Sequence, residues 1–173
     1  MKDFYIPQHS PLKAVTYYFR DLDELPRGSQ LSPYTVWPAT VYDAPRIAAL
    51  HNECFPSEKP CTWNSVRDYL QRNSGYVAMD GERVVGYVQM RLPAEIVSVG
   101  VEERVRRRGV GLDLIHHALR RFAILGMTKS IIAFPEERRQ ALGFLRAAGF
   151  ESQEERWARG VETFPIVSDT MAS

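Results

Sequence analysis

The sequence carries almost no excess of charge of either sign. Lys and Arg number 22 and Asp and Glu number 21 in 173 residues, which leaves a net charge of +1. A protein that binds nucleic acid or an anionic membrane through a general basic surface needs a large positive excess. We therefore expect neither nucleic acid nor a membrane as a partner, and any recognition through charge has to come from a local cluster.

Long apolar runs are missing, and cysteines are few. No run approaches the roughly 20 residues that span a bilayer, and the starting segment MKDFYIPQHS lacks the apolar core of a secretory signal. Cys54 and Cys61 form neither a C-x-x-C pair nor a zinc-binding pattern with histidines. We interpret them as idle thiols, with a disulfide or metal site as the alternative, and we expect a cytoplasmic protein without a metal.

The composition fits one globular domain. Hydrophobic residues make up 45% of the chain and charged residues 25%, which excludes collagen-like and largely disordered chains. A chain of this length buries a core without disulfides or metals. No internal repeat is visible and no linker follows Pro33, so we expect one domain over residues 34–173 and an N-terminal extension over residues 1–33.

The extension contains a helix signal. Ser10-Pro11 is typical of a helix start, and Pro26 is typical of a helix end. Between them apolar residues recur at helical spacing: Leu12, Val15, Phe19, Leu22 and Leu25. This pattern predicts an amphipathic helix over residues 11–25 that packs on the domain.

The rest of the chain mixes strand and helix signals. Asp80-Gly81 joins two apolar runs and is a strong β-hairpin signal. Strands are predicted at 35–37, 76–79, 84–90, 96–101 and 131–134, helices around 47–54, from near 62, over 114–123 and over 136–148, and two last strands around the turn at Arg159-Gly160. This order predicts an α/β fold with a mixed, mostly antiparallel central sheet flanked by helices.

The loop between the strand at 96–101 and the next helix is the most informative segment. It holds three consecutive arginines and two glycines: Arg106, Arg107, Arg108, Gly109 and Gly111. The amides at a helix start have no intrahelical acceptor and the helix dipole adds positive charge, so a pyrophosphate fits there. Glycines would let the backbone approach the phosphates, and guanidinium groups would bind them. The alternative is a basic surface turn before an ordinary helix.

The motif Arg106-x-x-Gly109-x-Gly111, with Ala-Leu-Gly-Phe-Leu-Arg-Ala-Ala-Gly-Phe at 141–150, resembles the GNAT acyltransferase superfamily over roughly residues 34–166. The resemblance implies a GNAT-like fold and acetyl-CoA as co-substrate. It implies that the strand before the loop offers backbone groups to the pantetheine and thioester, and that the loop binds the pyrophosphate. The cofactor-binding residues are then Val99, Gly100, Val101, Arg106, Arg107, Arg108, Gly109, Val110, Gly111 and Leu112.

Glu95 is the candidate general base. Ala94-Glu95-Ile96-Val97 resembles the histone acetyltransferase branch of the superfamily, in which a glutamate at this place takes the proton of the amine; residues 141–145 resemble that branch too. A carboxylate in the semi-apolar surroundings of Ile96 and Val97 could accept a proton directly or through water. The alternative is a strand-end carboxylate in solvent.

Two positions depart from the superfamily pattern. Leu145 stands where many members have a tyrosine that protonates the leaving thiolate, which leaves the general acid unassigned. Arg138 stands near the place of an asparagine that often anchors the cofactor arm.

These observations predict an N-acetyltransferase that moves an acetyl group from acetyl-CoA to a primary amine of a peptide, protein or small molecule. Direct attack is expected because neither cysteine has a recognisable base partner. A non-catalytic acyl-CoA-binding module is the alternative, and a nucleic-acid-binding protein that uses residues 104–108 is a weaker one. The acceptor and the oligomeric state, including a homodimer, stay open.

Overall fold

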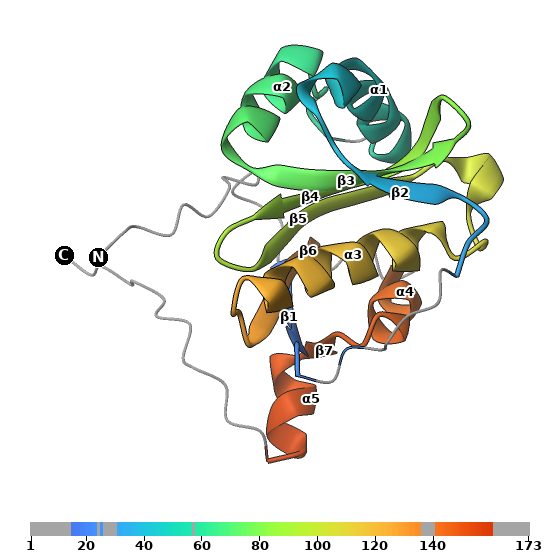
Figure 1. Ribbon diagram of the computed structural model, residues 1–173. Coiled ribbons are helices and arrows are strands. Elements are labelled where there is room, and N and C mark those ends of the chain that lie inside the picture. Colours follow the sequence, from blue (N-terminus) through green and yellow to red (C-terminus); the bar gives the residue numbers. More distant parts are fainter. Residues whose placement is uncertain (1–14, 24, 26–30, 57, 136–140, 161–173) are drawn as a thin grey trace.

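One sheet of seven strands organises the fold (Figure 1). The computed structural model describes residues 15–23, 25, 31–56, 58–135 and 141–160. The strand order is β2-β3-β4-β5-β6-β1-β7, with bounds β1 Val15–Asp21, β2 Thr35–Pro38, β3 Ser74–Asp80, β4 Arg83–Arg91, β5 Glu95–Val101, β6 Lys129–Pro135 and β7 Glu151–Ser152. All neighbours are antiparallel except β5 and β6, which confirms the predicted mixed, mostly antiparallel sheet.

Helices cover both faces of the sheet. Helices α1 (Ala44–Cys54) and α2 (Trp63–Arg72) lie on one face and α3 (Val110–Ile124) lies on the other (Figure 1). Two short helices, α4 (Leu142–Ala147) and α5 (Gln153–Ala158), follow β6, and 3-10 turns occupy Val41–Asp43 and Glu103–Val105. Among the described helices, none has the length and apolar character needed to cross a membrane.

Two buried clusters hold these layers together. The cluster beneath α1 and α2 contains Ile47, Val66 and Tyr87. The larger cluster lies between the sheet, α3 and α4. The two clusters remove apolar side chains of the helices and of both faces of the sheet from water, and such burial is the main source of stability.

The predicted hairpin and helix starts are confirmed. Gly81 adopts a φ of 60° in the turn between β3 and β4, a backbone conformation that glycine accepts readily. Helix α1 has a proline in its first two positions. Helix α2 is capped by Thr62, whose hydroxyl accepts from the Ser65 amide at 3.2 Å.

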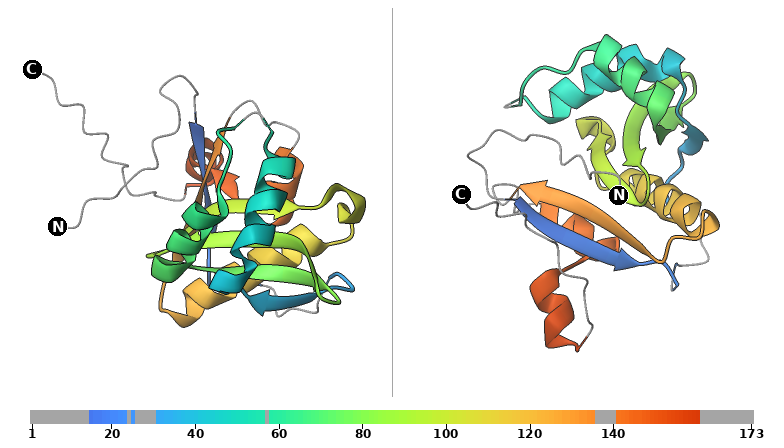
Figure 2. Two further views of the ribbon diagram at one scale, coloured as in Figure 1. Left: turned by 90° about the horizontal axis from the view of Figure 1, so that it is seen from above. Right: turned by 90° about the vertical axis from the view of Figure 1, so that its left-hand side faces the viewer.

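The prediction of a helix over residues 11–25 is wrong for the part of this segment that the structure describes. Residues Val15–Asp21 form β1, which pairs with β6 along its whole length and with β7 on its other side (Figure 2, right). The segment VTYYFRD is rich in β-branched and aromatic residues, and it covers an edge of β6 that would otherwise lack a partner. Residues 15–21 thus belong to the central sheet, while residues 11–14 lie outside the described part.

The C-terminal prediction is also corrected. In place of the strand predicted before the turn at Arg159-Gly160, the two-residue β7 leads into α5. The Ser152 hydroxyl accepts from the Glu155 amide at 3.2 Å and the Glu155 carboxylate accepts from the Ser152 amide at 2.8 Å, a capping box that favours a helix. The second predicted strand and residues 136–140 of the preceding helix lie outside the described residues.

Candidate active site

The two parallel strands at the centre of the sheet separate soon after they meet. β5 and β6 pair only at Glu95 with Ile131 and at Ile96 with Ile132. From residue 97 onward, the side of β5 that faces β6 has no partner among the described strands, and the β6–β1 pair runs apart from the rest of the sheet (Figure 2, right). Backbone groups of β5 are therefore available to a ligand over the stretch that leads to the arginine loop.

A β-bulge marks the point of separation. Gln89 of β4 pairs with Ser98, whereas its neighbour Met90 pairs with Ile96, so Val97 is an extra residue on β5. Bulges break the ladder locally and redirect side chains, and they are frequent beside active sites.

The arginine loop ends at the start of α3, as the sequence predicts. Gly109 is the N-cap and provides no side-chain cap to the first-turn amides of the helix. Arg106, Arg107 and Arg108 are all exposed. Arg107 has a φ of 62°, which is uncommon outside glycine. Full positive charges, a helix dipole and uncapped amides therefore meet at one place, which suits an anion.

Two of these arginines also contact neighbouring elements. The Arg106 Nε donates to the carbonyl of Val101 at 3.0 Å, and Arg108 Nη1 donates to the Tyr34 hydroxyl at 3.4 Å. The loop is thus tied to the end of β5 and to the segment before β2.

The two glycines of the motif have a physical reason within the protein itself. A Cβ at Gly109, whose φ is 82°, would lie 2.9 Å from the Leu31 carbonyl oxygen. A Cβ at Gly111 would lie 2.8 Å from Cε2 of Phe144 in α4. Backbone conformation and the contact with Leu31 thus favour glycine at position 109, and the contact with Phe144 favours it at position 111, without any phosphate.

Asp113 is a residue of this region that the sequence analysis missed. Its buried carboxylate accepts the amides of Leu31 and Ser32, each at 2.7 Å. A carboxylate in the first turn of α3 is also favoured by the helix dipole. Asp113 thereby fastens a distant segment beside the start of the helix.

Glu95, the sequence-based candidate base, is held by a cation. Arg91 Nε donates to Glu95 Oε2 at 2.8 Å, and Arg91 Nη2 also contacts that oxygen. The pair is half-buried at the junction of β4 and β5. The ion pair places a cation on this carboxylate, a contact that the sequence does not indicate. The role of Glu95 as the general base stays a prediction.

A chain of hydrogen bonds lies on the other side of the bulge, under α1. His51 Nδ1 is 2.7 Å from the Tyr87 hydroxyl oxygen, which is 2.9 Å from Ser98 Oγ. These residues come from α1, β4 and β5. The sequence gives no periodicity that would join them.

The structure also describes most of the other residues that the sequence singled out. Leu145 is fully buried in the larger core, and its hydrocarbon side chain has no proton to give to a thiolate. Arg138 lies outside the described residues. Both cysteines are free thiols, and burial raises the pKa of the Cys54 thiol despite its contact with Arg106. Within the described ranges, no group of three His, Cys, Asp or Glu side chains could hold a metal ion.

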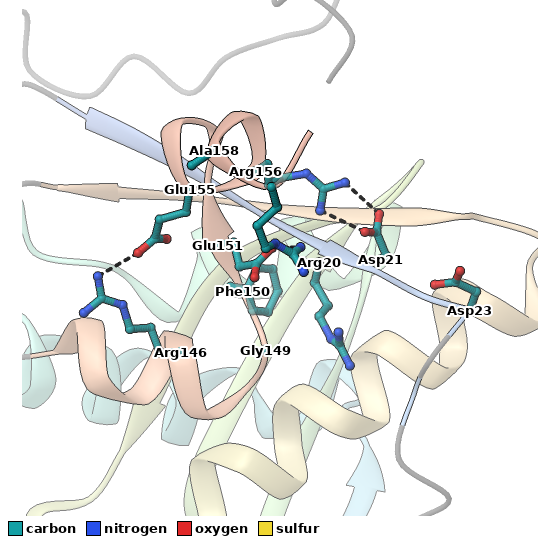
Figure 3. A pocket seen from close by; sticks show the side chains of 11 residues that line it. Arg20, Asp21, Asp23, Arg146, Gly149, Phe150, Glu151, Glu155, Arg156 and Ala158 are labelled. Atoms are coloured by element: carbon teal, nitrogen blue, oxygen red, sulfur yellow. Dashed lines mark hydrogen bonds and ion pairs between the residues drawn. The ribbon is translucent and has the colours of Figure 1, made fainter. Parts of the chain in front are cut away.

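A cavity of about 700 Å³ lies elsewhere, among β1, α4, β7 and α5 (Figure 3). The fully buried Arg156 pairs there with both carboxylate oxygens of Asp21 at 3.0 Å. Arg146 pairs with Glu155 at 2.8 Å. None of its lining residues belongs to the arginine loop or to the chain under α1, so we separate this cavity from the candidate active site.

Comparison with solved structures identifies the same fold at low identity. A GCN5-related N-acetyltransferase from Sphaerobacter thermophilus matches with a TM-score of 0.63 and 22% identity, over 80% of this chain and 48% of that one. A GNAT-family acetyltransferase from Colwellia psychrerythraea matches with a TM-score of 0.62 and 12% identity, over 82% and 53%. An aminoglycoside acetyltransferase from an uncultured soil sample, solved with sisomicin, matches with a TM-score of 0.56 and 18% identity, over 66% and 86%. The chain spans about half the length of the first two.

Comparison of the sequence gives the family. No curated protein matches the chain. The model of the acetyltransferase (GNAT) family matches residues 44–150, which include α1, the β3–β4 hairpin, the arginine loop and α4. The match is to the family as a whole, so the resemblance to the histone acetyltransferase branch stays a hypothesis. The chain therefore belongs to the acetyltransferase (GNAT) family.

Proposed function

We propose that this protein is an acyltransferase that moves an acetyl group from acetyl-CoA to a primary amine of a peptide, protein or small molecule. The observation that carries the proposal is the order of three features along one stretch of chain. β5 pairs with β6 only as far as Ile96 in the described part of the chain, it contains a bulge at Val97, and it ends in a basic loop at the start of α3. A ligand with an anionic pyrophosphate at one end and a thioester at the other fits that order.

The donor would lie along β5 and the arginine loop. The residues proposed to hold it are Val99, Gly100, Val101, Arg106, Arg107, Arg108, Gly109, Val110, Gly111 and Leu112. Exposed arginines and uncapped first-turn amides suit the pyrophosphate. On its β6-facing side, β5 pairs with no described strand beyond Ile96, and backbone groups there suit the pantetheine arm and the carbonyl oxygen, on which negative charge develops during acyl transfer. Acetyl-CoA supplies the activated carbonyl when it is bound.

Direct attack by the amine is favoured over an acyl-enzyme. The Cys54 thiol lies at the end of β5, where it donates to the Val101 carbonyl at 3.5 Å. Its pKa is raised, mainly by burial, so the reactive thiolate is disfavoured at neutral pH. The rate would then come from positioning of the two substrates and from the backbone donors.

The attacking amine also has to lose a proton. Glu95 is the sequence-based hypothesis for the acceptor. Both contacts with Arg91 are made by Oε2, so the carboxylate would accept the proton on Oε1, directly or through water.

The donor site is tested by charge removal with a matched control. Arg107→Gln removes an exposed charge of the loop, and Arg121→Gln removes an exposed charge from the last turn of the same helix. We expect Arg107→Gln to weaken acetyl-CoA binding about 10-fold, the order of one charge-assisted hydrogen bond, and Arg121→Gln to leave it unchanged. Calorimetric titration with acetyl-CoA measures both, and equal affinities in the two variants would remove the loop from the site.

The reaction is tested by a mass-spectrometric screen of acetylated products over peptides, polyamines and small amines. Turnover on any amine supports the proposal. Tight acetyl-CoA binding without any product would favour the non-catalytic module. Binding to duplex DNA that weakens steeply with salt would favour the nucleic-acid alternative.

A further inference from the structure

The chain His51, Tyr87 and Ser98 connects the bulge of β5 with the surface of the protein. The Tyr87 hydroxyl is hydrogen-bonded at both ends, to His51 Nδ1 at 2.7 Å and to Ser98 Oγ at 2.9 Å. On its other side the His51 ring places Nε2 3.5 Å from a Glu58 carboxylate oxygen. Side-chain exposure increases along this chain of hydrogen bonds. Tyr87 is fully buried, His51 is 17% exposed and Glu58 is 40% exposed.

The inner end of the chain lies at the proposed reaction site. Ser98 follows the bulged Val97 directly, just beyond the last residue of β5 that pairs with β6 in the described structure. Its side chain contacts Tyr87 and therefore points to the face of the sheet that α1 covers. The end of α1 also contacts the end of β5, since Cys54 donates to Val101 and accepts from Arg106. The chain and the arginine loop thus border the same stretch of β5.

The hydrogen bonds fit one direction of donation. Glu58 favours a proton on Nε2 of His51, which leaves Nδ1 as the acceptor of the neutral ring. The Tyr87 hydroxyl then donates to Nδ1 and accepts from the Ser98 hydroxyl. The remaining lone pairs of Ser98 Oγ can accept a proton from a substrate.

We propose that Ser98, Tyr87 and His51 form the path by which the acceptor amine loses its proton; the inference rests on the proposed acetyl transfer. The ammonium group gives one proton to Ser98, Ser98 gives its own to Tyr87, and Tyr87 gives its own to His51. The neutral amine forms the C–N bond, the C–S bond breaks, and the second proton of the nitrogen goes to the departing thiolate. His51 is left as an imidazolium beside Glu58 and returns its proton to solvent.

The environment of Tyr87 suits a relay that never stores charge on the phenol. Burial raises the pKa of Tyr87 above its usual range, so a phenolate is disfavoured and the phenol hands on a proton only as it receives another. Other titratable groups face the chain from three sides: Glu58, the Cys54 thiol and the Cys61 thiol, with Arg106 next to Cys54. None of these is an alternative partner of the Tyr87 hydroxyl, which is already bonded to His51 and Ser98.

The path is tested by Tyr87→Phe, which keeps the buried ring and removes only the hydroxyl. The matched control is Tyr69→Phe, since the Tyr69 hydroxyl also donates to a neighbour of the bulge, the Met90 carbonyl, at 2.7 Å but lies outside the chain. With acetyl-CoA and the amine that is acetylated fastest in the screen, Tyr87→Phe should lower kcat at neutral pH by about 10²-fold or more. The acetyl-CoA dissociation constant of the variant should stay within about 2-fold of the wild-type value. Loss of the proton path predicts this result, whereas damage to the donor site would weaken acetyl-CoA binding.

The pH profile and a double variant separate a relay from a structural role. The defect of Tyr87→Phe should shrink as pH rises, because more of the amine is then already deprotonated. His51→Gln should show the same loss of kcat. The double variant should lose no more kcat than either single variant, because both residues lie on one path and either substitution alone interrupts it. Two results would overturn the path. One is a kcat profile against pH that runs parallel in wild type and Tyr87→Phe, and the other is a kcat loss in the double variant equal to the product of the two single losses. Loss of the acidic limb in Glu95→Gln alone would move the role to Glu95.

A measurement without turnover distinguishes this inference from the proposed function. Nitrogen-15 NMR of the His51 ring in the protein alone should show a proton on Nε2 and none on Nδ1 at alkaline pH. A proton on Nδ1 would overturn the path whatever the enzyme acetylates. A wild-type protein that binds no acetyl-CoA and acetylates no amine would overturn the proposed function, whereas turnover that is unaffected by Tyr87→Phe would overturn only the path.

Discussion

The ring of Tyr87 lies directly on the backbone of Gly100. A Cβ at position 100 would come within 2.4 Å of Cε1 and 3.1 Å of the hydroxyl oxygen of that ring. Because Tyr87 is fully buried, the ring has little room to yield. We expect Gly100→Ala to lower the free energy of unfolding by about 1–3 kcal/mol through overpacking, measured by urea denaturation.

Gly143→Ala is the matched control for this change. Gly143 lies inside α4, and a Cβ there would meet nothing within 4 Å. Alanine has the higher helix propensity, so this variant should be more stable by about 0.5–1 kcal/mol. Equal effects of the two substitutions would show that the contact with Tyr87 carries no strain.

Asp113 should contribute more to the free energy of unfolding than an ordinary acidic residue in the first turn of a helix. Asp113→Ala removes the acceptor of two amides, of Leu31 and Ser32, and we expect a loss of about 2–4 kcal/mol. Asp113→Asn keeps one acceptor oxygen and should lose less. Hydrogen exchange at the two amides should speed up in the same order, and unchanged exchange in Asp113→Ala would contradict the proposed anchoring.

The exposed Asp43 provides the comparison. Its carboxylate also accepts a backbone amide at 2.7 Å, from Thr40, but the pair lies at the surface. Asp43→Asn should therefore cost less than about 1 kcal/mol, the usual range for an exposed cap.

His116 should make stability depend on pH. Its pKa is lowered from about 6.5, first by burial and then by the charge of Arg120. The unfolded chain then binds the proton more readily, so stability is full above about pH 6.5 and is lost as pH falls through the lower, folded-state pKa. We expect the free energy of unfolding to fall more between about pH 7.5 and 5 in the wild type than in His116→Gln.

Arg120→Gln tests the cause of that dependence. Removing the neighbouring charge should weaken the pH dependence in part, because burial of His116 persists. Urea denaturation at the two pH values measures all three proteins. Parallel losses in wild type and His116→Gln would assign the pH dependence to other groups.

Signals confined to a few neighbouring residues determined much of the fold. Asp80-Gly81 specifies the hairpin because its turn geometry depends on the backbone freedom of Gly81. The loop from Arg106 to Gly111 likewise specifies the start of α3, because the N-cap Gly109 has a left-handed backbone conformation. The family motif in the same loop predicted the superfamily, because its residues are adjacent in sequence.

Tertiary structure decided what depends on distant partners. Residues 15–21 have apolar spacing that also fits a helix, and they form a strand because the edge of β6 offers a ladder of hydrogen bonds that no local pattern reveals. His51, Tyr87 and Ser98 come from three elements and meet only through the packing of α1 on the sheet. The bulge at Val97 and the ion pair of Glu95 with Arg91 depend on strand register, which a single sequence does not encode locally.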